Sequence, residues 1–156
     1  MTKSILVASA EKLVQPTAQA AQEYAAKAEM LVVEMNKRML SRADLALLIG
    51  EGNEAMMEDN HRNHTRFMAS VFLDYQPNVI VETVLWVFRA YRSHGFKLTY
   101  WPAQLDHWLE LFNLHLSKET VQQIYPFYNW MIINQAAFVK ESDQLILAQQ
   151  TPAHGS

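Results

Sequence analysis

Two apolar stripes that meet at a single proline constrain the fold of this 156-residue chain more than any other feature. Before Pro77, side chains of one stripe recur every three or four positions from Met57 to Tyr75. After it, the same spacing runs from Ile80 to His94. This period puts one side chain per turn on a common helical face, so the sequence predicts two amphipathic helices joined by a short turn. A proline is tolerated in the first turn of the second helix, where its missing N–H has no partner to lose.

The remainder of the chain also follows a helical pattern. Residues 17–40 are rich in Ala, Glu, Gln, Lys and Met, which favour helices, and a short helix is predicted over 45–49. Two more long helices are predicted from about Thr99 and from Ser117 onward. With only 4 Gly and 5 Pro, turn-rich β structure is disfavoured. We therefore predict an all-α fold of about six helices, with an up-down helical bundle as the runner-up arrangement.

Composition indicates one folded unit. Hydrophobic residues make up 50% of the chain and charged residues 19%, which favours a buried core over disorder. We expect residues 1–15 to be a flexible leader, residues 16–148 a single all-α domain, and residues 149–156 a disordered tail. Pro126 lies inside the last predicted helix, where it should cause a kink.

Several function classes are disfavoured by what the chain lacks. It has no Cys, which excludes disulfides, thiolate nucleophiles and Cys-based zinc sites. Its formal charge is −3 and its basic residues are scattered, so nucleic-acid binding is not expected. No stretch is long and apolar enough to predict a membrane span, and no Gly-x-Ser-x-Gly or glycine-rich phosphate loop occurs. We expect a cytoplasmic protein, and we favour a binding function over an enzymatic one while both stay open.

Polar residues interrupt the two apolar stripes. Asn60 and His64 lie in the first, and Tyr91 and His94 lie in the second. A buried polar group without a partner costs about 1–3 kcal/mol, so these groups either bond one another or face a ligand. Both interpretations stay open. A third also stays open, in which the helices are rotated so that these polar groups face solvent. The predicted ligand-binding residues are Asn60, His64, Phe67, Val87, Tyr91, His94 and Trp101.

One stretch has a familiar order of residue types: Tyr91-Arg92-Ser93-His94-Gly95-Phe96, followed by Tyr100 and Trp101. It resembles the end of the haem-side helix in sensor globins, and the predicted helices over 53–139 are similar in order to the last four globin helices. The resemblance implies a globin-like arrangement of the helices, in preference to a ferritin-like bundle, and a pocket between the two central helices for haem or another apolar small molecule. It makes Tyr91 or His94 the axial ligand if haem is bound, with His64 on the distal side. The position that aligns with the proximal histidine is a tyrosine, and some globin-like regulatory domains bind no haem.

The resemblance implies a non-catalytic, ligand-sensing domain in signal transduction. Because no output segment is visible, we expect a signalling partner protein and a homodimer formed through the last two helices. One alternative is an iron-binding ferritin-like enzyme that uses Glu58-x-x-His61, although this motif occurs once and lies off the apolar stripe, on a face predicted to be solvated. The other is a helical interaction module with a filled interior and no small ligand.

Overall fold

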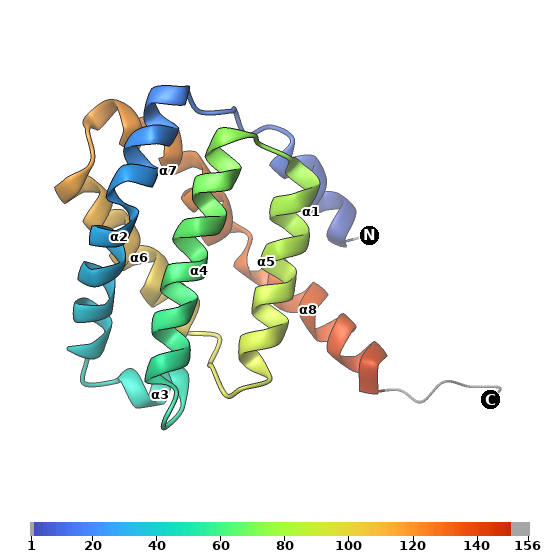
Figure 1. Ribbon diagram of the computed structural model, residues 1–156. Helices are drawn as coiled ribbons and strands as arrows, with labels where there is room; N and C mark the ends of the chain where they lie inside the picture. The colour runs from blue at the N-terminus through green and yellow to red at the C-terminus, as the bar shows by residue number, and fades with distance from the viewer. Residues whose placement is uncertain (1, 151–156) are drawn as a thin grey trace.

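Eight helices account for most of residues 2–150, the range that the computed structural model describes, with side chains described for residues 2–144. No strand occurs in this range, so the predicted all-α class is confirmed, and the helices form one compact domain (Figure 1). None of these helices is long and apolar enough to cross a bilayer. Their bounds are α1 Thr2–Ala10, α2 Ala18–Leu40, α3 Leu45–Ile49, α4 Glu54–Leu73, α5 Pro77–Arg92, α6 Tyr100–His115, α7 Lys118–Ile133 and α8 Gln135–Gln150.

The closest helix packing falls into two groups. In the first group α2 lies along α4 and also packs on α6 and α7, while α6 packs on α7. In the second group α5 lies against α1 and α8, which also contact each other. Although α4 and α5 are consecutive and antiparallel, they belong to different groups and stand apart along most of their length (Figure 1). The boundary between the two groups therefore passes between the two helices that carry the polar-interrupted stripes.

Residues 1–15 differ from the predicted flexible leader because they contain α1. Leu6 and Ala10 lie one helical turn apart and are fully buried. Ser9 Oγ accepts a hydrogen bond from Trp130 Nε1 at 2.8 Å, and the hydroxyl of Tyr75 donates to the carbonyl of Ala10 at 2.5 Å. Contacts with distant residues order this short segment, and its own sequence gives little indication of them.

The segment predicted as one last helix forms two helices, and the break between them does not lie at Pro126, where a kink was predicted. The helix continues through Pro126 and ends at Ile133, and α8 begins at Gln135. Asn134 lies at the junction, where its side-chain amide donates to the carbonyl of Trp130 at 2.8 Å. An asparagine side chain that bonds the backbone in this way competes with continuation of the helix. The predicted disordered tail begins inside α8, and residues 151–156 lie outside the described range.

A carboxylate on α2 fixes the start of α7. Glu23 accepts hydrogen bonds from the backbone N–H of Ser117 at 2.6 Å, from Ser117 Oγ at 2.7 Å and from Thr120 Oγ1 at 2.7 Å. Burial raises the pKa of Glu23, but the hydrogen bonds from Thr120 and Ser117 outweigh it and lower the pKa to about 2. An anion at a helix N-terminus is also favoured by the helix dipole. Glu23 thus stabilises the four-helix group on the side away from α5.

Candidate functional site

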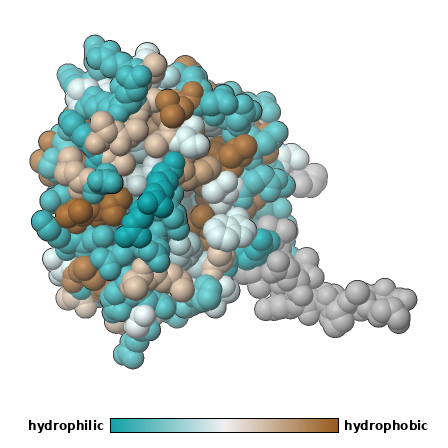
Figure 2. Space-filling model, viewed as in Figure 1, coloured by the Kyte–Doolittle hydropathy of each residue, from teal (hydrophilic) through white to brown (hydrophobic). Residues whose placement is uncertain are grey.

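A cavity of about 250 Å³ lies between α4 and α5, at the boundary of the two helix groups. The surface is hollowed between these helices in the space-filling view (Figure 2). Side chains from α6 and α7 close the inner side. The apolar part of the lining comes from all four helices and consists of Phe67, Met68, Val84, Val87, Phe88, Leu105 and Met131, with the rings of Trp86 and Trp101.

Six of the seven predicted ligand-binding residues line this cavity. They are Asn60, His64, Phe67, Val87, Tyr91 and Trp101. The five on α4 and α5 converge because the three- and four-residue spacing holds along both helices and turns both stripes toward the space between them, whereas Trp101 comes from α6. Their role in ligand binding stays a prediction, whereas their position around one cavity is observed.

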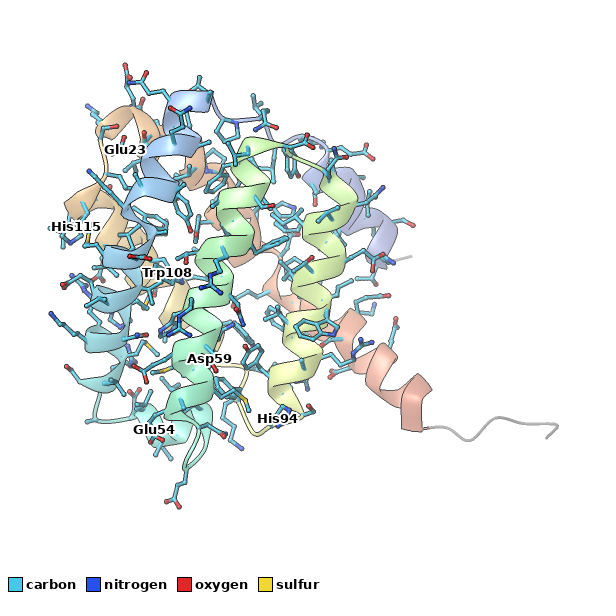
Figure 3. The ribbon with its side chains drawn as sticks, viewed as in Figure 1. Glu23, Glu54, Asp59, His94, Trp108 and His115 are labelled. Atoms are coloured by element: carbon cyan, nitrogen blue, oxygen red, sulfur yellow. The ribbon has the colours of Figure 1, made fainter. Side chains whose placement is uncertain are left out.

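His94, the seventh predicted residue, is not part of the cavity lining. Its side chain is exposed beyond the end of α5 (Figure 3), and its carbonyl accepts a hydrogen bond from Asn53 Nδ2 at 2.9 Å. The same amide donates to the carbonyl of Ile49 at 2.7 Å. Because α5 ends at Arg92, the helical period no longer applies at His94. Gly95 follows with a φ of 100° and turns the chain away.

One buried polar cluster lies behind the cavity. The side-chain oxygen of Asn60 accepts from the hydroxyl of Tyr100 at 2.8 Å and from Gln104 Nε2 at 2.5 Å. The Tyr100 hydroxyl also lies 3.3 Å from His61 Nε2, and His61 Nδ1 lies 2.6 Å from the side-chain oxygen of Asn36. The amide oxygen of Asn60 has two donors, and the contacts of His61 with Asn36 and Tyr100 link α2, α4 and α6.

A second chain of hydrogen bonds holds His64. Its Nε2 lies 2.7 Å from the hydroxyl of Tyr128, which lies 3.0 Å from the hydroxyl of Tyr24. The indole of Trp108 stacks on the imidazole with a centroid separation of 5.3 Å. Burial lowers the pKa of His64 to about 3, so the ring is neutral at physiological pH. The side chain therefore presents an uncharged, fixed face to the cavity.

The expectation that His61 lies on a solvated face with Glu58 is wrong. Its side chain is fully buried, and burial is the main cause that lowers its pKa to about 3, with smaller contributions from His64 and His107. The reason is that α2 packs closely along α4 and covers a wider face than the stripe alone would need. Among the described residues, no group of three or more His, Asp or Glu side chains is placed to hold a metal ion.

Of the residues that α6 contributes to the site, sequence reasoning predicted Trp101 but missed Tyr100 and Gln104. Gln104 lines the cavity, and Tyr100, one helical turn earlier, supports it with a hydrogen bond of 2.9 Å. Trp101 also lines the cavity, and its indole Nε1 is a buried donor without a protein acceptor. The only signal for Tyr100 and Gln104 was their i, i+4 spacing on the predicted helix, which identifies a shared face but not its neighbour.

The residues around this cavity do not fit a haem. His94 lies outside the lining, and burial raises the pKa of Tyr91, which works against the phenolate that would ligate iron. An engineered protein cavity of about 150 Å³ holds one benzene ring, whereas a haem has four pyrrole rings with substituents. The cavity of about 250 Å³ suits a molecule with one or two rings.

Comparison of the chain with protein-family models, with curated proteins and with solved structures gives no match. The globin-like arrangement therefore stays a prediction.

Proposed function

We propose that this protein is a non-catalytic sensor domain that binds a small, mostly apolar molecule between α4 and α5. The observation that carries the proposal is the cavity of about 250 Å³, whose lining combines apolar side chains with a few fixed polar groups. Ligand sites in proteins have this composition, with polar groups that orient the ligand and apolar groups that supply affinity. The proposed ligand is smaller than haem.

The position of the cavity supports a sensing role. A ligand in it contacts α4 from one helix group and α5 from the other, so it would favour arrangements in which both groups close on it. Helix α5 is coupled to α8 through Arg92, whose Nη1 donates to Ser142 Oγ at 3.0 Å and to an Asp143 carboxylate oxygen at 2.5 Å. Ligand occupancy would thus be transmitted to α8.

The output of the sensor would then pass through another protein chain. A homodimer through α7 and α8 in the cytoplasm, or a separate signalling partner, is the form we expect. On α7, Tyr125 and Ile133 expose 46% and 68% of their surface, which would supply apolar contact area. Trp130, on the same helix, is buried against α1 and belongs to the core.

A cavity-filling substitution tests the proposal. Val87 lines the cavity from α5, and Val87→Phe places a ring in the space that the ligand would occupy. We expect the unmodified protein to bind 4-propylphenol with a dissociation constant below about 1 mM, equivalent to at least about 4 kcal/mol. The variant should bind it at least tenfold more weakly. Isothermal titration calorimetry measures both affinities.

Val33→Phe is the matched control because Val33 is exposed on α2 and does not line the cavity. Its affinity for 4-propylphenol should equal that of the unmodified protein. Absence of saturable binding to the unmodified protein, or an equal loss of affinity in both variants, would contradict the proposed site.

A further inference from the structure

We infer that the ligand of this cavity is an uncharged molecule with a hydrogen-bonding head at one end and an apolar body, which rests on the proposed function. The inference names the chemical class of the ligand. It follows from two properties of the lining, namely the absence of charged side chains among its described residues and the separation of its polar and apolar parts along α4 and α5.

The described lining provides no counter-charge for an ion. It contains no Asp, Glu, Lys or Arg, and His64 is neutral because burial lowers its pKa to about 3. On the same helix, Asp59 and Arg62 form an exposed ion pair at 2.7 Å, and Arg66 is exposed. A carboxylate or phosphate that entered the cavity would lose its hydration without a paired cation, which costs several kcal/mol.

Three of the polar side chains that line the cavity lie together at one of its ends. Because α4 and α5 are antiparallel, the first half of α4 lies beside the end of α5, as the positions of Glu54 and His94 show (Figure 3). At this end Asn60, Asn63 and Tyr91 line the cavity. The amides of Asn60 and Asn63 lie close enough to Tyr91 to oppose the rise of its pKa on burial.

The other end of the cavity is mostly hydrocarbon, although Thr83 of α5 also lines it there. Phe67 lies seven positions after Asn60 on α4, and Val84 lies seven positions before Tyr91 on α5, which corresponds to about 10 Å along each helix. Met131 of α7 also lines the cavity. A bound molecule would satisfy both ends if its polar head lay beside Tyr91 and its apolar body extended toward Phe67 and Val84.

Three probes of nearly the same shape distinguish the effect of ligand charge on affinity from the effect of ligand polarity. They are 4-ethylbenzamide, which is neutral and polar, 4-ethylbenzoate, which is an anion at pH 7, and 1-ethyl-4-isopropylbenzene, which is apolar. We expect calorimetric titration to show that the benzamide binds at least tenfold more tightly than the benzoate. Equal or tighter binding of the benzoate would overturn the inference. It would leave the proposed site intact, because 4-propylphenol would still bind and Val87→Phe would still weaken that binding.

Tyr91→Phe tests the polar end because it removes one hydroxyl and keeps the ring. We expect this variant to bind the benzamide about fivefold more weakly and the hydrocarbon no more weakly than the unmodified protein does. Tyr125→Phe, at an exposed position on α7, is the matched control and should change neither affinity. An equal loss for both probes in Tyr91→Phe, or no loss for the benzamide, would overturn the polar head. Failure of 4-propylphenol and all three probes to bind would instead remove the proposed function.

Discussion

Acidification from pH 7 to pH 4 is expected to lower the free energy of unfolding by about 7 kcal/mol, chiefly because the buried His61 and the half-buried His64 are both held in the neutral form. Burial lowers the pKa of both His61 and His64 to about 3, whereas a histidine in an unfolded chain titrates near 6.5. Between these values the unfolded chain binds more protons than the folded chain, so stability falls as the pH falls. Each pH unit in this window costs about 1.4 kcal/mol per histidine.

This loss is large compared with the roughly 5–15 kcal/mol by which single domains are stable. Glu23 adds to it below pH 4.5, because its pKa in the folded protein is lowered to about 2 and its stabilising charge is lost on protonation. Urea unfolding at a series of pH values from 7 to 4 measures the effect. The expected result is a steady loss of stability that begins near pH 6.5.

Substitution of one histidine identifies the source of the pH dependence. His64→Gln removes one titrating group, so the slope of stability against pH below 6 should decrease by about 1.4 kcal/mol per pH unit. His94→Gln, at an exposed position, is the control and should leave the slope unchanged. Constant stability of the unmodified protein between pH 6.5 and 4.5 would show that the imidazoles are not buried as described.

Removal of the Trp108 side chain is expected to cost about 3–5 kcal/mol. Its indole is fully buried, stacks on His64 and Phe112 with centroid separations of 5.3 Å and 6.0 Å, and meets His61 edge-on at 5.9 Å. Trp108→Ala would leave a void between the two polar clusters and free both imidazoles to move. Urea unfolding at pH 7 measures the loss.

Trp108→Phe should cost much less than Trp108→Ala, because it keeps an aromatic ring and removes an indole N–H that is buried without an acceptor. Trp86→Ala is the control for loss of a tryptophan, since Trp86 exposes 56% of its surface, and we expect it to cost less than about 1 kcal/mol. The packing described for Trp108 would be contradicted if the two alanine variants were equally destabilised.

Local periodicity was sufficient to predict the two helices that form the cavity walls and most of their inward-facing residues. Asn60 and His64 on α4 and Val87 and Tyr91 on α5 follow the spacing, and all four line the cavity. The prediction for His94 depended on one further turn of α5, which the chain does not make. Helix ends are set by capping and turn geometry, which a periodic pattern does not specify.

Features that depend on the neighbour of each helix were beyond reach of the sequence. His61 is buried because α2 lies along α4, and Gln104 reaches the cavity because α6 closes its inner side. Leu6 and Ala10 are buried because α5 and α8 lie against α1. To predict each of these features, one must know which helices pack against one another. The apolar stripes of several helices are compatible with more than one such arrangement.

The cavity between α4 and α5 is tested most directly by xenon, which enters apolar cavities without requiring any chemistry of a natural ligand. NMR spectra of methyl-labelled methionines under xenon pressure report on Met68 and Met131, which line the cavity, and on Met35 and Met39, which are buried in α2 outside it. We predict saturable shifts of the Met68 and Met131 methyl signals and little change at Met35 and Met39. Unchanged signals from Met68 and Met131, or equal shifts at all four residues, would contradict the existence of the site.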